Sequence, residues 1–323
     1  MLEAVPDFTE EEVQHMLDNL DSFSDKEVVE INRIVDELAV RKVNQQAFDD
    51  LIEFCKKMQP DYIVGKHHRI LADLLMSIEQ GDKDRICVNI PPRHGKSQLV
   101  SIFFPAWFLG RNPGKKVMMV SHTTDLAVDF GRKVRNLIST DEYQAIFSTV
   151  QLASDSKSAG RWNTNSGGEY YACGIGSALA GRGADLLLVD DPHSEQDVIN
   201  GNFSVFEKAY EWFTFGARTR LMPGGRVAII QTRWHMDDLT GRVTRDMAQN
   251  ERADEYEVVE FPAILEVEDE ETDEIVEKPL WPEFFDLEAL LRTKASMPTF
   301  QWNAQYQQEP TAEEAALVKR EWW

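Results

Sequence analysis

The chain has 323 residues, is 42% hydrophobic and carries a formal net charge of −22. No stretch approaches the roughly 20 apolar residues of a membrane-spanning helix, and the acidic start MLEAVPDFTEEE is unlike a signal peptide, so we expect neither a membrane span nor a secretory leader. Three cysteines without paired spacing argue against a disulfide framework or a zinc site and indicate a reducing cytoplasm.

The negative charge is unevenly distributed along the chain. Residues 1–60 hold 15 acidic and 6 basic side chains, and residues 266–278 hold 8 and 1. These two stretches contribute −9 and −7, which leaves −6 for everything else. The core is therefore close to neutral, and basic side chains could line one of its surfaces. The alternative, a protein that avoids polyanions altogether, stays open on composition alone.

The first 60 residues are predicted to be helical and acidic. Between residues 9 and 57, apolar positions recur at helical spacing among acidic ones, which predicts two or three amphipathic helices. We interpret this region as a lid or docking element. The next segment, PDYIVGKHHRILADLLMSI, ends in a predicted helix. Its Tyr62, His67 or His68 could stack on an adenine, and a satisfied surface histidine is the alternative.

The stretch RICVNIPPRHGKSQLVS, residues 85–101, has the pattern of a phosphate-binding loop. Residues 85–90 predict a buried strand, and Gly95, Lys96 and Ser97 open a helix whose free N–H groups favour phosphate oxygens. Lys96 would reach the β and γ phosphates, and the Ser97 hydroxyl would bind Mg²⁺. The usual pattern has Gly where Ile90 stands, so an ordinary strand-to-helix turn is the alternative. We assign nucleotide binding to Arg93, His94, Gly95, Lys96, Ser97 and Gln98.

Strands and helices alternate after this loop. Pro105 is expected to kink or end the loop helix, and residues 115–121 predict a second buried strand that leads into a helix at 125–138. Residues 160–174 have the turn signals and alternating aromatic residues of a hairpin. This β-α-β-α order predicts an α/β fold with a mostly parallel sheet, covered by helices on both faces.

Two acids, Asp190 and Asp191, follow a predicted strand at 185–189. An apolar strand that ends in acid is the second signature of a nucleotide hydrolase: Asp190 would hold the water shell of Mg²⁺, and Asp191 would orient the attacking water. Most motors have Glu at the second position, so Glu195 and His193 remain alternatives for the base. Taken alone, the run LLLVDDP could also be a strand with a capped turn.

The remaining strands complete the predicted core. The buried strand 226–231 ends next to the expected γ phosphate, where Thr232 could sense hydrolysis. The other role open to Thr232, a helix N-cap, fits Asp237 better. A helix at 237–249 and a strand at 255–261 then complete the α/β unit.

The C-terminal region is predicted to contain a loop and two helices. The acidic insertion 266–278 is expected to be a solvated loop. Residues 287–295 and 299–308 are predicted to form short helices that pack back on the sheet. The predicted division is a helical region at 1–60, an ATPase core at 61–265, and the acidic loop with C-terminal helices at 266–323.

An ordered set of motifs resembles the large terminase subunit of tailed bacteriophages. The motifs are PPRHGKS, PAWFLGRNPGKKVMMVS, GRWNTNSGG, GRGADLLLVDDP, TRWHMDDLTGR, and LWPE followed by FQWNAQYQQEP, and they run from about residue 60 to 310. The resemblance implies a P-loop NTPase fold of the ASCE, RecA-like class with a small helical lid region. It also implies an ATP-driven motor that translocates double-stranded viral DNA into a procapsid.

The resemblance assigns roles to individual residues. It implies that Lys96 and Ser97 contact phosphate and Mg²⁺, that Asp190 is the metal-side acid and that Asp191 is the catalytic acid. Thr232 matches the motif that couples the γ phosphate to subdomain motion, and the resemblance implies that Arg93 could act as a phosphate sensor. Family members form rings, so an arginine should reach the neighbouring subunit's nucleotide. Arg182 is the first choice, with Arg161 and Arg233 behind it and a structural role within one subunit as the alternative.

The implied cofactors are ATP and Mg²⁺, and the implied partners are double-stranded DNA, the portal protein of the procapsid, the small terminase subunit and further copies of this chain in a ring. No membrane association is implied, and the expected location is the host cell cytoplasm. The family usually carries a metal-dependent nuclease after the motor. This chain stops at ALVKREWW, where that domain would start, so we expect an ATPase without nuclease activity, with the nuclease truncated or encoded elsewhere.

Two other interpretations stay open. A superfamily-2 helicase has a near relative of DDPH, but about 90 residues after Thr232 cannot supply a second motor lobe. A nucleotide-gated module that docks on a capsid or on DNA without turnover is the non-catalytic alternative. Phosphate release with and without DNA separates these interpretations.

Overall fold

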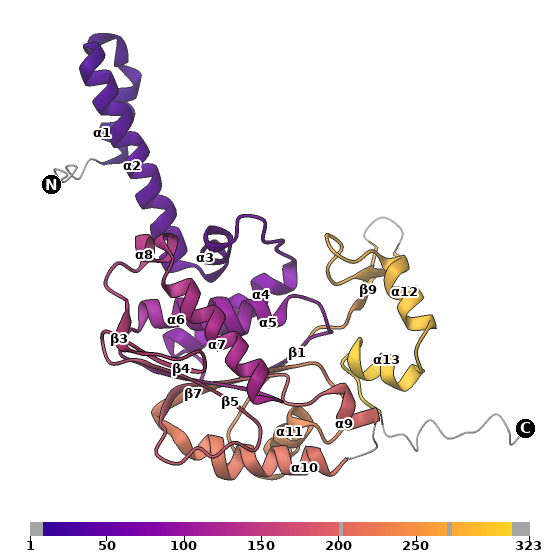
Figure 1. Ribbon diagram of the computed structural model, residues 1–323. Coiled ribbons are helices and arrows are strands. Elements are labelled where there is room, and N and C mark those ends of the chain that lie inside the picture. Colours follow the sequence, from indigo (N-terminus) through magenta and orange to yellow (C-terminus); the bar gives the residue numbers. More distant parts are fainter. Residues whose placement is uncertain (1–8, 200–202, 270–272, 312–323) are drawn as a thin grey trace, which may run out of the picture.

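The computed structural model describes residues 9–199, 203–269 and 273–311. A central sheet of eight strands carries helices on both faces, so the predicted α/β fold is confirmed (Figure 1). Within these residues, no helix combines the length and the apolar character needed to span a membrane. The strands of this sheet, in spatial order, are β3 (Leu152–Lys157), β4 (Arg161–Thr164), β5 (Glu169–Gly174), β2 (Lys116–Ser121), β6 (Ala184–Asp190), β7 (Leu221–Gln231), β1 (Arg85–Asn89) and β8 (Glu257–Glu260).

Six neighbouring strands of the sheet, from β5 to β8, run parallel. The predicted hairpin is formed by the antiparallel pair β4 and β5, and β3 adds to its edge. Side chains of the central strands alternate between two apolar layers: Val88 and Leu188 face one, and Cys87 and Val189 face the other. The strands are buried on both faces, as a parallel sheet covered by helices requires.

Helices cover each face of the sheet. One layer is contributed by α3 (Leu51–Met58), α4 (Lys66–Gln80), α5 (Lys96–Gln98), the π-helical turn η2 (Leu99–Phe103), α6 (Phe104–Arg111), α7 (Thr124–Ile138) and α8 (Asp141–Ile146). The other side carries α9 (Glu195–Ile199), α10 (Ser204–Glu211), the π-helical turn η3 (Trp212–Ala217), the short 3₁₀ helix η4 (Arg218–Arg220) and α11 (Leu239–Gln249).

The helix after the phosphate loop does not end at Pro105. It passes from α5 through the π-helical turn η2 into α6, and Pro105 lies in the first turn of α6. A proline lacks the N–H that would bond to the preceding turn, and a π turn absorbs the disturbance without ending the helix. The helix that was expected to kink or end at Pro105 therefore does not end there, and its departure from regular α-helix is the π-helical turn just before the proline.

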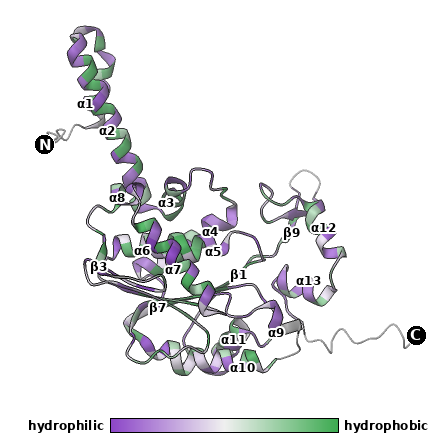
Figure 2. Ribbon diagram, viewed as in Figure 1, coloured by the Kyte–Doolittle hydropathy of each residue, from purple (hydrophilic) through white to green (hydrophobic). Residues whose placement is uncertain are grey.

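The N-terminal helices form an arm that projects away from the sheet (Figure 1). It consists of α1 (Glu10–Asp18), the 3₁₀ turn η1 (Leu20–Ser22) and α2 (Asp25–Asp49), so the predicted amphipathic helices are present. Of the 25 residues of α2, Ile31, Ile34 and Ala47 are buried, and hydrophilic and hydrophobic residues alternate along the arm (Figure 2). Because the arm points away from the phosphate loop, it does not form a lid over it in this structure.

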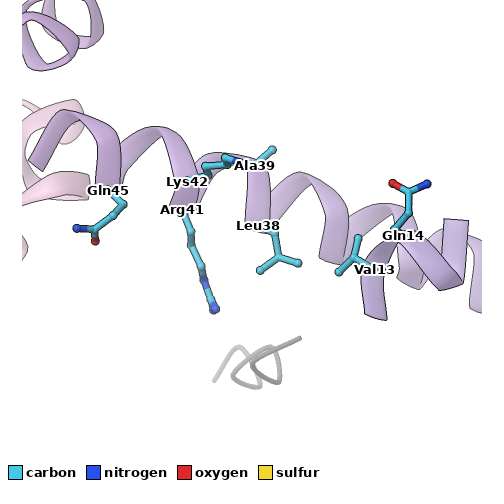
Figure 3. A pocket seen from close by; sticks show the side chains of 7 residues that line it. All are labelled: Val13, Gln14, Leu38, Ala39, Arg41, Lys42 and Gln45. Carbon is cyan, nitrogen blue, oxygen red and sulfur yellow. The ribbon is translucent and has the colours of Figure 1, made fainter. Parts of the chain in front are cut away.

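A groove of about 590 Å³ lies along the arm, between α1 and α2. Val13 of α1 and Leu38 of α2 lie side by side in it, and Arg41 extends beside them (Figure 3). It contains neither the phosphate loop nor the paired acids, so it is not the site that the motifs predict.

The acidic insertion is an antiparallel hairpin, not the solvated loop that its charge suggested. Strand β9 (Ile264–Glu268) pairs with β10 (Ile275–Pro279), and residues 270–272 lie outside the described part of the chain. Val267 faces Val276 across the pair, and Ile275 adds a further β-branched residue. These β-branched residues favour strands, and their preference outweighs the repulsion among the exposed carboxylates.

The predicted C-terminal helices are present as α12 (Leu287–Ala295) and α13 (Thr299–Gln305). Leu290 and Trp302 pack with Ala263 and Ile264 at the start of β9, in a core separate from those of the main sheet. The prediction that these helices pack back on the sheet is therefore wrong. Residues 263–311, called here the C-terminal module, surround this separate core, and Leu280 joins the module to the core of the main sheet (Figure 1).

Candidate active site

The candidate site lies where three neighbouring parallel strands end. The phosphate loop follows β1, Asp190 ends β6, and β7 lies between them and ends at Gln231. Backbone hydrogen bonds continue the ladder beyond the strands: the Ile90 N–H donates to the Gln231 carbonyl at 3.0 Å, and the Asp191 N–H donates to the Ile230 carbonyl at 3.0 Å. The parallel topology thus gathers motifs that are about 90 residues apart in sequence at one edge of the sheet.

The phosphate loop contains two residues in the left-handed region, Arg93 with φ 61° and Gly95 with φ 80°. Glycine is required at 95 for a second reason, because a Cβ there would lie 2.1 Å from His68 Nε2. Lys96 follows as the first residue of α5. The loop therefore turns sharply into the N-terminus of a helix, as a phosphate-binding loop does.

Two buried histidines of α4 support this loop. His67 Nε2 and His68 Nε2 both donate to the His94 carbonyl, at 3.0 and 3.1 Å, and His68 Nδ1 accepts from the Gly65 N–H at 2.9 Å. The His68 ring is therefore neutral, with its proton on Nε2. The loop carbonyl just before Gly95 is held by two side chains of α4.

Burial lowers the pKa of His68 to about 3 and that of His94 to about 4. Desolvation disfavours the charged form, and the neighbouring histidines oppose protonation further. His67, His68 and Tyr62 are at most 9% exposed, so none offers a free face to an adenine, and none is the surface histidine of the alternative interpretation. The adenine-stacking hypothesis for these residues is wrong.

Lys96 and Asp191 form an ion pair at the centre of the site. Lys96 Nζ lies 2.8 Å from Asp191 Oδ2, and the side chains are 8% and 25% exposed. Burial alone would lower the pKa of Lys96, but the two carboxylates of Asp191 and Asp190 raise it above its ordinary value. The lysine is therefore charged at neutral pH.

Asp190 lies deeper, at 1% exposure. Its Oδ2 accepts from the Ser101 hydroxyl at 2.6 Å, whereas its Oδ1 is buried without a hydrogen-bond partner among the described residues. Burial and the neighbouring Asp191 raise the pKa of Asp190, while Lys96 and the hydroxyls of Ser101 and Ser97 lower it. An orphaned carboxylate oxygen next to a serine hydroxyl is a place where a cation could bind.

Thr232 connects the two loops of the site. Its N–H donates to Asp191 Oδ1 at 2.9 Å, and its hydroxyl donates to the Ile90 carbonyl at 3.0 Å. Asp191 is held in the left-handed region, with φ 44°, an uncommon conformation that the surrounding contacts must stabilise. The N-cap of α11 is Asp238, whose side chain accepts from the Gly241 N–H, so the choice of Asp237 as the cap is wrong by one residue.

A cavity of about 440 Å³ opens over Lys96 and Asp191. Glu195 also lines it, so this alternative base stays open. His193 does not: it is 2% exposed, its Nε2 accepts from the Leu239 N–H, and burial lowers its pKa to about 4. The remaining lining residues are Pro92, Thr232, Trp234, Met297, Gln301 and Gln305.

The other residues assigned to the loop differ in orientation. Arg93 is exposed at the tip of the loop, and Ser97 follows Lys96 on α5. The His94 ring is buried against His67 and Phe285, and its Nδ1 donates to the Pro92 carbonyl. The Gln98 side chain donates to Gln59 Oε1. His94 and Gln98 could therefore contact a nucleotide through their backbone but not through these side chains as placed.

The three candidate arginines lie in two environments. Arg233 is buried in ion pairs with Asp238 and Glu260, at 2.9 and 3.2 Å, so it is not available to a neighbouring subunit. Arg182 pairs with Glu169 at 3.3 Å, and its guanidinium lies 4.5 Å from the centre of the Tyr171 ring.

Arg161 contacts the same Glu169 carboxylate, at 3.0 Å. Glu169 begins β5, and Arg182 precedes β6. Both arginines therefore lie where the parallel strands start, whereas the phosphate loop lies where these strands end. Neither can reach the Lys96 of its own chain.

Two groups at the site were not predicted from the sequence. Ser101 lies four residues after Ser97, a spacing that places both hydroxyls on one helix face and could have indicated its role. Gln301 and Gln305 are separated from Asp191 by more than 100 residues, and although both lie in the motif FQWNAQYQQEP, that motif was given no role at the site.

Residues 87–322 match the family model described as terminase large subunit, T4-like-virus type, N-terminal. No curated protein matches the chain. Among solved structures, the large terminase of bacteriophage HK97 is similar, with 13% identity, a TM-score of 0.46, and coverage of 77% of this chain and 51% of that one. This chain therefore spans about half the length of the HK97 protein.

Two further solved structures are also similar. The ATPase domain of the Thermus phage P74-26 large terminase has 16% identity, a TM-score of 0.44, and coverage of 73% of this chain and 92% of that one. The large terminase of a thermophilic bacteriophage, solved in complex with ADP, has 11% identity, a TM-score of 0.40, and coverage of 72% of this chain and 52% of that one.

Proposed function

Because the family match covers more than half of the chain, the protein belongs to the terminase large subunits of the T4-like-virus type, and we propose that it is an ATPase that moves double-stranded viral DNA into a procapsid. The observation that carries the proposal is the meeting of Lys96, Asp190, Asp191 and Thr232 at the ends of three adjacent strands. A phosphate-binding lysine, a deep acid and a second acid at the cavity are the groups that nucleotide hydrolysis needs.

The proposed cofactor is Mg²⁺ bound with ATP, and the residues present fit it. Asp190 Oδ1 is a buried oxygen without a partner in the described part of the chain, and the Ser97 hydroxyl is near enough to affect the pKa of Asp190. Among the described residues, no group of three or more His, Cys, Asp or Glu side chains could hold a metal, so the other ligands would be phosphate oxygens and water. The ion would offset phosphate charge as it develops.

We assign the orientation of the attacking water to Asp191. Lys96 holds its Oδ2, and the Thr232 N–H holds its Oδ1. A terminal phosphate would compete for Lys96, and Oδ2 would then be free to accept a proton from water. Because Thr232 also contacts the Ile90 carbonyl, a shift of Asp191 would be transmitted to the phosphate loop and to β7.

The proposed partners are the portal protein, the small terminase subunit, DNA and further copies of this chain in a ring. Of the candidates for an arginine that completes a neighbour's site, Arg182 remains our choice and Arg161 stays behind it, because both lie at the opposite ends of the parallel strands from the Lys96 of their own chain. Mixing Arg182→Ala with Lys96→Ala tests this proposal. Mixed rings should regain part of the activity if each variant lacks a different half of a shared site. If wild-type rings form but mixtures stay inactive, Arg182 acts within its own chain.

Phosphate release from ATP by the purified chain, with and without double-stranded DNA, tests the function itself. We expect slow release by the chain alone and faster release in rings on portal and DNA, because an arginine from a neighbour accelerates such reactions by about 10³-fold or more. The absence of Mg²⁺-dependent release under every one of these conditions would refute the proposal and favour a non-catalytic docking module. We also expect no metal-dependent cleavage of plasmid DNA by the chain.

A further inference from the structure

Two glutamines of the C-terminal module face the same cavity as Lys96 and Asp191. Gln301 and Gln305 line the 440 Å³ cavity together with Lys96 and Asp191. They are four residues apart on α13, so both side chains lie on one face of that helix. The neighbouring Trp302 and Ala304 are buried on the other side of α13.

Several contacts hold α13 at the mouth of the cavity. The Arg233 N–H, just after β7, donates to Gln308 Oε1 at 3.1 Å, and the Ala263 N–H donates to the Tyr306 carbonyl at 2.6 Å. Gln308 is 1% exposed and has φ 62°, so it is fixed in an uncommon conformation. Because the residues just after α13 are bonded to the segment after β7 and to the residue before β9, the fold places the glutamine face of α13 over the site.

The charges of the cavity explain why amides suit this position. Of the described residues that line it, Lys96 is the one cation, and Asp191 and Glu195 are carboxylates. A terminal phosphate placed against Lys96 still has oxygens that need donors, and a further carboxylate there would repel it. Glutamine amides donate hydrogen bonds without adding charge.

We propose that Gln301 and Gln305 donate hydrogen bonds to the terminal phosphate of a bound nucleoside triphosphate, so that the site distinguishes a triphosphate from a diphosphate. This inference rests on the proposed function, since it concerns the same nucleotide. It assigns the C-terminal module a direct contact with the phosphate that hydrolysis removes.

Equilibrium binding of two nucleotides to the full chain, in the presence of Mg²⁺, tests the proposal. The probes are ADP and an ATP analogue with a non-hydrolysable bond between the β and γ phosphates. Gln301→Ala and Gln305→Ala should each weaken binding of the analogue by about 2- to 10-fold, the range for one lost hydrogen bond, and leave ADP binding within about twofold. Gln305→Glu should weaken analogue binding more than Gln305→Ala, because a carboxylate would face the phosphate.

Asn303→Ala is the matched control, because Asn303 lies on the same helix but not in the cavity. It should bind both nucleotides as the wild type does. Circular dichroism and the melting temperature establish that each variant is folded.

Equal losses for ADP and for the analogue, or no loss for either, would overturn the inference. Lys96→Ala separates this from failure of the proposed function. If the wild type binds both nucleotides, Lys96→Ala binds neither and the glutamine variants behave as wild type, the inference alone fails. If the wild type itself binds neither nucleotide, the proposed function fails with it.

Discussion

Charged residues occupy two contrasting regions of the molecule, the phosphate-loop edge of the sheet and the N-terminal arm. At the sheet edge, Lys96 and Asp190 are 7% and 1% exposed, and each contacts a specific partner. On the arm, Arg33 pairs with Glu37 at 3.1 Å, but both side chains are about 40% exposed, at 41% and 39%. Water screens the pair on the arm, whereas the buried groups depend on one another. The same residue types therefore differ in energetic weight between the two regions: those at the sheet edge cannot be exchanged without leaving a partner unsatisfied, and those on the arm can.

The largest expected effect comes from removing the charge of Lys96 at the phosphate-loop edge of the sheet. Lys96→Ala should lower ATP hydrolysis by about 10³-fold or more, because no other cation of the described chain lines the cavity to hold the phosphates. Steady-state phosphate release measures this. Arg33→Ala on the arm is the matched control and should retain the wild-type rate. Normal turnover by a folded Lys96→Ala variant would show that hydrolysis does not depend on this buried lysine.

Asp191→Asn should separate binding from cleavage. The amide keeps the size of the side chain, and the proposed metal contacts of Asp190 and Ser97 would be retained, so nucleotide affinity should change little. Hydrolysis should fall by about 10²- to 10⁴-fold, the usual contribution of a general base. Glu195→Gln is the parallel variant, since Glu195 lines the same cavity. An active Asp191→Asn together with an inactive Glu195→Gln would transfer the role of base to Glu195.

Double-mutant cycles compare the two regions directly in free energy of unfolding. For Lys96→Met with Asp191→Asn we expect a coupling energy of about 2 kcal/mol, because Asp191→Asn leaves the buried Lys96 charge without its partner and Lys96→Met leaves the partly buried Asp191 carboxylate without its own. For Arg33→Ala with Glu37→Ala we expect less than about 0.5 kcal/mol, the usual value for an exposed pair on a helix. Urea denaturation measures both cycles. Equal coupling energies would contradict the distinction drawn between the regions.

The core of the site could be predicted from the sequence because each part is local. Lys96, Asp190 and Thr232 each follow an apolar run, and the ends of parallel strands meet at one edge. Their assembly therefore needs only strand recognition and a topological rule.

What could not be predicted depends on contacts between distant segments. Nothing in the sequence shows that His67 and His68 turn inward onto the His94 carbonyl, or that α13 returns over Asp191. The hairpin of β9 and β10 was missed because the eight acids of residues 266–278 obscured their β-branched neighbours. A run of acidic residues indicates that a segment is exposed to water, and an exposed hairpin meets that condition as well as a loop does.

The last expected effect concerns the histidines behind the loop and appears as a pH dependence of stability. The pKa of His68 is about 3 in the folded chain, against about 6.5 for an unperturbed histidine, so below pH 6.5 the unfolded chain binds more protons. The free energy of unfolding should therefore fall as the pH drops from 6.5 towards 4, by up to about 1.4 kcal/mol per pH unit for this residue.

Histidine substitutions isolate this contribution. His68→Gln retains an N–H donor but does not titrate, so its stability should fall less steeply over the same pH range, whatever its stability at pH 7. Urea denaturation at several pH values between 7 and 4.5 measures the slopes. His15→Gln, on the exposed face of the arm, is the matched control and should keep the wild-type slope. Identical slopes for His68→Gln and the wild type would show that His68 does not resist protonation in the folded chain. The phosphate-loop edge of the sheet would then lack one of the groups that distinguish it from the N-terminal arm.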